Sequence, residues 1–151
     1  MKENDKVSQF LGVNQYGETI NLEDYRGKKV IVYFYPKAST PGCTNEAISF
    51  NELYEEYKEN DVVILGVSKD KKEALIKFKE KNGLKFDLIS DEDLTIINEF
   101  GVWQEKKMCG KPYMGIVRTT FVIDENGNVE KVFDKVNTKT HGQDVLNYLN
   151  K

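Results

Sequence analysis

A strand, a short turn and a helix follow one another within Val30–Tyr57, and this stretch constrains the fold most. Val30–Tyr35 is an apolar run rich in β-branched and aromatic side chains, which is typical of a buried strand. Pro36 ends that strand, and Thr40 is a suitable N-cap for a helix with a proline at its first position. Apolar residues then recur at a helical period, at Ala47, Phe50, Leu53, Tyr54 and Tyr57. The pattern predicts a helix with Cys43 in its first turn, at the carboxyl end of a buried strand.

The position of Cys43 at a helix start favours a reactive thiolate. The thiolate is the nucleophilic form of cysteine, and the free N–H groups and positive dipole end of a helix start stabilise it. A buried structural cysteine is the alternative, because free cysteines are among the most buried residues. The proline and glycine immediately before Cys43 favour the reactive interpretation.

Length and charge narrow the class of protein. The chain has 151 residues, of which 39% are hydrophobic and 31% charged, so we expect one domain over residues 1–151. A net charge of −3 without a basic run argues against a nucleic-acid or anionic-membrane partner. The first residues lack the apolar core of a signal peptide, and no run is long enough to span a membrane. We therefore expect a cytoplasmic protein.

The chain contains two cysteines, Cys43 and Cys109, and one histidine. A permanent disulfide is uncommon in a reducing compartment, and these scattered residues do not form a structural zinc set. No metal, haem or flavin motif is present, so we expect no cofactor and a chemistry carried by the protein's own sulfur.

The remaining patterns predict an α/β chain. We expect strands at 9–13, 18–21, 61–68, 86–90, 116–124 and 129–133, a helical turn at 22–25, and helices at 71–81, 91–100 and 143–149. Trp103–Gly115 contains two glycines and a proline and is expected to be an irregular loop. The alternating middle of the chain predicts parallel strands, and the Asn126-Gly127 hairpin adds antiparallel ones. An active cysteine at a strand's carboxyl end suits the binding edge of such a sheet.

The segment FYPKASTPGCTNEA resembles the peroxiredoxin active site, whose pattern Pro36, Thr40 and Cys43 match. With the later segments GVWQEKK and GIVRTTFVID, the chain looks like the bacterioferritin comigratory protein, or peroxiredoxin Q, subgroup. The likeness runs from about Asn14 to Leu149. It implies a thioredoxin fold of the peroxiredoxin type, with a mixed central sheet flanked by helices and an N-terminal β-hairpin extension.

The resemblance also implies roles for four residues. Cys43 would be the peroxidatic cysteine that attacks a peroxide and becomes a sulfenic acid, and Thr40 would place its hydroxyl on the peroxide. Pro36 would shield the pocket from water, and Arg118 would match the family's active-site arginine. Each has a simpler alternative: Thr40 as an N-cap only, Pro36 as a strand end, and Arg118 as a surface ion-pair partner.

Acidity alone does not explain a fast peroxidase. A free cysteine is about 3% thiolate at pH 7, and a pKa near 6 would raise that fraction only ~30-fold. A lower pKa also weakens the nucleophile. The rest of the rate must come from a fixed positive charge that stabilises the negative charge building on the two peroxide oxygens as their bond breaks. Arg118 suits this role because arginine stays charged and presents a planar fork of donors.

The chain departs from the subgroup pattern in its second cysteine. Many members carry a resolving cysteine five residues after the first, where Ile48 stands here, and others carry it in the helix at 71–81, which has none. Cys109 is the other thiol. It resolves Cys43, or it is incidental, or an external thiol reduces Cys43 directly.

We therefore expect a thiol peroxidase that reduces hydrogen peroxide and organic hydroperoxides and is recycled by thioredoxin or a similar dithiol protein. The resemblance implies a monomer, with a dimer as the alternative. A thioredoxin-like oxidoreductase is disfavoured because Cys43 is not followed by a second cysteine at CxxC spacing. A cysteine-based redox sensor or partner-binding module is the remaining alternative.

Four further residues are expected to lie outside the catalytic machinery. We expect Glu46 to complement the helix dipole, with a role in placing Arg118 as the alternative. We expect His141 to cap a helix or face solvent, and the aromatic pair Trp103 and Tyr113 to pack in the core rather than line the pocket.

Overall fold

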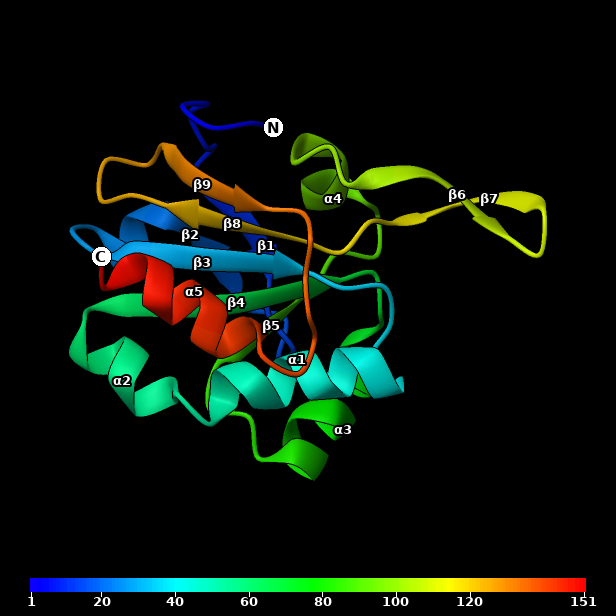
Figure 1. Ribbon diagram of the computed structural model, residues 1–151, viewed down its shortest axis with the longest axis horizontal. Helices are drawn as coiled ribbons and strands as arrows, with labels where there is room; N and C mark the ends of the chain where they lie inside the picture. The colour runs from blue at the N-terminus through cyan, green and yellow to red at the C-terminus, as the bar shows by residue number, and fades with distance from the viewer.

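A five-stranded mixed sheet forms the centre of the molecule in the computed structural model, which describes residues 1–151 (Figure 1). The strand order is β5-β4-β3-β8-β9. The central strand β3 runs parallel to β4, as the sequence pattern predicts, and antiparallel to β8. The bounds are β3 (Lys29–Phe34), β4 (Val62–Ser68), β5 (Asp87–Ser90), β8 (Thr119–Ile123) and β9 (Val129–Phe133).

Side chains of β3 alternate between two apolar cores, one on each face of the sheet. Ile31 and Tyr33 face a core that also contains residues of four helices, and Val30 and Val32 face a core built with the N-terminal strands. The four helices are α1 (Pro41–Asn51), α2 (Tyr54–Glu59), α3 (Lys72–Asn82) and α5 (His141–Leu149). Burial on both faces explains why β3 is a continuous apolar run.

The predicted N-terminal hairpin is present and covers the second face of the central sheet. It consists of β1 (Phe10–Val13) and β2 (Thr19–Asn21), followed by the 3₁₀ turn η1 (Leu22–Tyr25). The short helix α4 (Thr95–Glu99) packs against the same core through Ile96 and Ile97. The sequence predicts a helix from Asp91, but the helix begins at Thr95. The Asp91 carboxylate accepts a hydrogen bond from the Ile97 amide, and Leu94 has a left-handed conformation.

The segment predicted to be an irregular loop is instead a regular hairpin of β6 (Trp103–Met108) and β7 (Lys111–Ile116), and that prediction is wrong. Cys109 and Gly110 form its two-residue turn, both with positive φ, which suits the twist of a tight hairpin. The hairpin projects away from the central sheet (Figure 1). Beyond its base at Trp103 and Ile116 no core covers the strands, so they are polar and lack the alternation that identifies a strand in sequence.

The helix after Cys43 also differs slightly from the prediction, because the expected single helix is broken between α1 and α2. None of the helices combines the length and the apolar character that a membrane crossing requires.

Candidate active site

Cys43 is the third residue of α1, at the end of β3, as the sequence predicts. Its side chain is 2% exposed and belongs to the helix-side core. Thr40 is the N-cap residue in extended conformation, and its carbonyl accepts the Thr44 amide at 2.9 Å. The amides of Gly42 and Cys43 belong to the first turn of α1 and therefore have no partners within the helix.

Arg118 contacts Cys43 from the segment that leads into the neighbouring strand β8. It immediately precedes β8, and because Thr119 of β8 pairs with Phe34 of β3, it lies beside the end of β3 and the start of α1. Its Nη2 donates to Cys43 Sγ at 3.4 Å. A Cβ on Gly42 would be only 3.4 Å from the same nitrogen, so the glycine leaves room for the guanidinium.

Glu46 holds the other end of the guanidinium. Arg118 Nη1 donates to Glu46 Oε1 at 2.5 Å, so one planar group bridges the thiol and the carboxylate. Glu46 is 0% exposed, and burial raises its pKa to about 7 although the charge of Arg118 opposes that rise. The sequence favours a dipole role for Glu46 outside the site, but the structure shows its alternative role, since it holds Arg118. Its spacing of three residues from Cys43, which places both on one helix face, was the signal that could have included it.

The turn before α1 is fixed by hydrogen bonds. The Thr40 hydroxyl donates to the Lys37 carbonyl at 2.8 Å, so its side chain does not cap the helix. The Ala38 amide donates to the Asp70 carboxylate at 2.8 Å, which ties this turn to the residues after β4. Pro36 follows β3 and is half-buried. The turn is thus held in one conformation around the helix start.

His141 is buried, and the expectation that it caps a helix or faces solvent is wrong. It begins α5, and its ring packs edge-on against Phe50 and Phe133. Its Nε2 lies 2.8 Å from Thr120 Oγ1 and 3.9 Å from Glu46 Oε2. Burial lowers the pKa of His141 to about 4, so the ring is neutral at physiological pH.

Cys109 lies at the tip of the β6–β7 hairpin, exposed and unbonded, while Cys43 is buried. The six residues of β7 separate the tip from the Arg118 region, a length of about 17–20 Å at the rise of an extended strand. A disulfide requires Cα atoms within about 7 Å. The conformation described here therefore keeps the two thiols apart.

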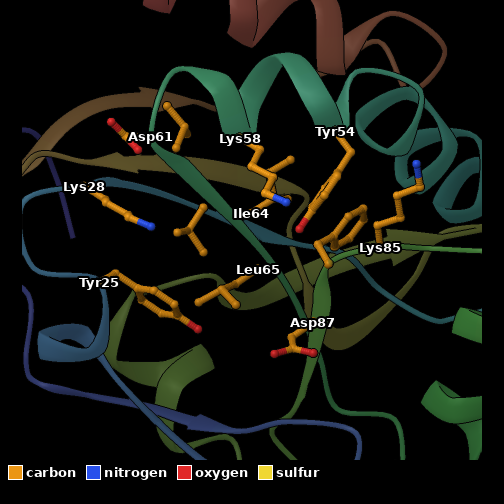
Figure 2. Close-up of a pocket in the computed structure, with 12 residues that line it drawn as sticks. Tyr25, Lys28, Tyr54, Lys58, Asp61, Ile64, Leu65, Lys85 and Asp87 are labelled. Carbon is orange, nitrogen blue, oxygen red and sulfur yellow. The ribbon is translucent and has the colours of Figure 1, made fainter.

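One groove of the molecule lies away from Cys43. This cavity of about 260 Å³ lies at the beginning of β4 and β5, at the end of the sheet opposite to Cys43. Figure 2 shows the side chains that line it. Its lining includes Tyr25, Tyr54 and three lysines and none of the predicted site residues.

Two aromatic residues are expected in the core. Trp103 packs against the core, but Tyr113 is exposed on the hairpin, so the prediction is wrong for Tyr113.

Comparison with known proteins identifies relatives over the whole chain. The model of the AhpC/TSA family matches residues 4–132. Peroxiredoxin Bcp of Escherichia coli strain K12 is 47% identical over 149 residues, which cover 99% of this chain and 96% of the relative. Peroxiredoxin Bcp of Bacillus subtilis strain 168 is 48% identical over 134 residues, covering 89% of this chain and 85% of the relative.

Solved structures agree with these relatives. The bacterioferritin comigratory protein of Xanthomonas campestris, whose alkyl peroxide reduction has been studied structurally, superposes with a TM-score of 0.87 at 35% identity, covering 97% of this chain and 98% of that one. A peroxiredoxin Q of Xylella fastidiosa gives a TM-score of 0.92 at 30% identity, covering 99% of this chain and 96% of that one. The predicted thioredoxin fold is confirmed.

Proposed function

This chain belongs to the AhpC/TSA family, among peroxiredoxins of the Bcp and peroxiredoxin Q kind, and from that premise we propose that Cys43 is the residue that reduces peroxide. The relatives make the protein a thiol peroxidase. In the proposed step the Cys43 thiolate attacks one oxygen of the peroxide. A sulfur–oxygen bond forms and the oxygen–oxygen bond breaks. Cys43 is oxidised by two electrons to a sulfenic acid, and the peroxide leaves as an alkoxide or hydroxide that takes a proton from water.

The bridging guanidinium is the observation that carries this proposal. Arg118 contacts Cys43 Sγ with one nitrogen while Glu46 holds another, so its positive charge is fixed before substrate arrives. Negative charge passes from sulfur to the departing oxygen during the reaction. A cation preorganised at that point stabilises the transition state more than the ground state.

Thr40 and Pro36 complete the proposed site. Because the Thr40 hydroxyl already donates to Lys37, its oxygen lone pairs are free to accept the O–H of a peroxide beside Cys43. Pro36 lacks an N–H and shields the strand end from water. Both assignments follow the family motif, and the placement of Pro36 and Thr40 around the start of α1 supports them.

The position of Cys109 favours direct reduction of Cys43 by an external thiol. A bond between the two cysteines would require the hairpin to fold back or α1 to unwind, whereas an external thiol needs only access to Cys43. We propose a thioredoxin-like dithiol protein as that reductant. Cys43, Glu46 and Arg118 come from one chain, which supports a monomer as the functional unit, and the shared central sheet supports a single domain. A cytoplasmic location remains a prediction.

Intact mass after one equivalent of hydrogen peroxide tests the proposal. The parent protein and Cys109→Ser should both gain about 16 or 32 mass units, while Cys43→Ser should gain none at that dose. Loss of about 2 mass units in the parent alone would show that Cys109 forms a disulfide with Cys43. Peroxide turnover that survives Cys43→Ser would contradict the proposed role of Cys43. Turnover with a thioredoxin system separates the enzyme from a single-use redox sensor.

A further inference from the structure

A basic hollow adjoins the turn that leads into α1. Its volume is about 550 Å³, and it lies between the residues that follow β3 and those that follow β4. Because Phe34 of β3 pairs with Val67 of β4 in a parallel register, both segments emerge at the same edge of the sheet (Figure 1). The hollow therefore opens at the end of the sheet at which Cys43 lies.

The lining of this basic hollow is rich in lysine. Two acidic residues, Asp70 and Glu73, also line it. Asp70 Oδ2 accepts the Ala38 amide and the Ser68 hydroxyl, both at 2.8 Å, so the protein itself already engages this carboxylate. The lysines are all exposed, and none of them forms an ion pair within the chain: Lys37, Lys69, Lys71 and Lys77. Positive charge is thus concentrated on one face of a chain whose net charge is −3.

The basic hollow and the active-site turn share two residues. Pro36 and Lys37 line the hollow, and the Lys37 carbonyl accepts the hydroxyl of Thr40, the N-cap residue of α1. The bond from the Ala38 amide to Asp70 ties the β4 side of the hollow to the same turn. A molecule seated on the lysines is therefore in contact with the turn that leads to Cys43.

The size of the basic hollow favours a protein surface as its occupant. A water molecule takes up about 30 Å³ of the liquid, so a hollow of about 550 Å³ is too wide for one inorganic anion to meet lysines on all sides. The lysines also come from three segments, since Lys37 follows β3, Lys69 and Lys71 follow β4, and Lys77 lies on α3. Several carboxylates on the surface of a protein match this arrangement.

We propose that the basic hollow is the docking surface for the protein that reduces oxidised Cys43, and that this reductant presents an acidic surface to it. The inference rests on the proposed function of Cys43. One thiol of the reductant attacks the sulfenic sulfur of Cys43, so that a disulfide bond forms and water leaves. The second thiol then displaces the Cys43 thiolate. The reductant is oxidised by two electrons, and Cys43 returns to its reduced state.

The burial of Cys43 is the reason that docking matters. Its side chain is 2% exposed, so collisions with a protein thiol in arbitrary orientations do not reach it. Complementary charges steer two proteins into one orientation and raise their association rate by about 10- to 10³-fold, an effect that salt weakens. The lysines beside the turn supply such steering to an acidic partner.

Charge reversal at the basic hollow separates docking from chemistry. The double variant Lys71→Glu/Lys77→Glu reverses two charges there. The matched control is Lys28→Glu/Lys58→Glu, which makes the same change in net charge on two exposed lysines of the cavity in Figure 2, at the opposite end of the sheet. All proteins carry Cys109→Ser, so that Cys43 is their one thiol.

Each protein is first oxidised with one equivalent of hydrogen peroxide and then reduced, either by a thioredoxin of net negative charge or by the uncharged dithiothreitol. Rapid mixing followed by intact mass gives the rate of each step. For Lys71→Glu/Lys77→Glu we expect reduction by thioredoxin to be about tenfold slower than for the parent at about 20 mM salt, and about twofold slower at about 0.5 M. Oxidation by peroxide, reduction by dithiothreitol and both steps of the control should stay within about twofold of the parent.

Four results would overturn the docking surface. They are an unchanged rate with thioredoxin, an equal loss in the control, an equal loss with dithiothreitol, and a parent that dithiothreitol reduces but thioredoxin does not. A second copy of the chain as the occupant would appear as a dimer of the parent that the double variant loses, and it would overturn the proposal as well. Oxidation is measured before any reductant is added, so a parent whose Cys43 does not react with peroxide would instead contradict the function proposed for Cys43.

Discussion

Glu46 and His141 should change the stability of the fold in opposite directions as the pH changes. The folded protein keeps a proton on Glu46 up to a pKa of about 7, whereas the unfolded chain releases it near 4.5, so the free energy of unfolding falls as pH rises through this range. His141 does the reverse. The unfolded chain takes up a proton near pH 6.5 that the folded protein refuses until a pKa of about 4, so the free energy of unfolding rises with pH across that range.

Each of these two pKa shifts corresponds to about 3 kcal/mol of unfolding free energy. Between about pH 4.5 and 6.5 their effects on the free energy of unfolding cancel. Removing the histidine should expose the contribution of the glutamate. In His141→Gln the contribution that rises with pH is lost. The free energy of unfolding of the variant, relative to that of the parent protein, should therefore increase by about 2–3 kcal/mol as the pH is lowered from 7 to 4.5. Other titrating groups are common to both proteins and drop out of the difference.

Urea unfolding at several values between pH 4.5 and 7.5 measures this difference. The chain has a single histidine, so its ring proton resonance gives an unambiguous second measurement by NMR. That resonance should stay at its neutral position down to about pH 5. Titration of the histidine near pH 6.5 would refute the argument that His141 is buried and neutral. So would a difference in free energy of unfolding between parent and variant that stays the same at every pH.

Three other substitutions have definite expectations. Arg118→Lys should lower kcat/KM for hydrogen peroxide about 10²–10³-fold, because an ammonium group is not a planar fork that can hold Glu46 and Cys43 together; unchanged kcat/KM would contradict the bridging role. Gly142→Ala should lower the free energy of unfolding by about 1–3 kcal/mol through its clash with the Ser49 carbonyl, measured by urea unfolding against Gln143→Ala, an exposed neighbour that should have little effect. Thr40→Val should lower kcat/KM about tenfold while Thr40→Ser should not, and equal losses would mean that the hydroxyl does not contact the peroxide.

The elements that the sequence predicts well are those with strong local signals. β3 is apolar throughout because both its faces are buried, and the Pro-Gly-Cys start of α1 follows from helix-capping preferences. Arg118 has no such signal, since its contact with Cys43 depends on the pairing of β3 with β8, and the family motif alone identified it before the structure did.

Glu46 and His141 show why the rest of the site was missed. A glutamate within the first two turns of a helix usually faces solvent, and the burial of Glu46 here results from the arrival of α5, a contact between distant parts of the chain. His141 stands at a helix start, where capping is the usual role, and only the tertiary packing places it against Thr120. The β6–β7 hairpin was missed for the complementary reason, since only its base at Trp103 and Ile116 touches a core and the rest of its strands has no apolar alternation.

The antiparallel pairing of β3 with β8 also fixes when the protein becomes reactive during its synthesis. Cys43 precedes Arg118 by 75 residues, and a ribosome adding about 5–20 residues per second makes that stretch in about 4–15 seconds. During that time the nascent chain carries its cysteine without the guanidinium that fixes positive charge beside it. Chains that are released early, before β8 is made, should therefore react with peroxide no faster than ordinary cysteine peptides.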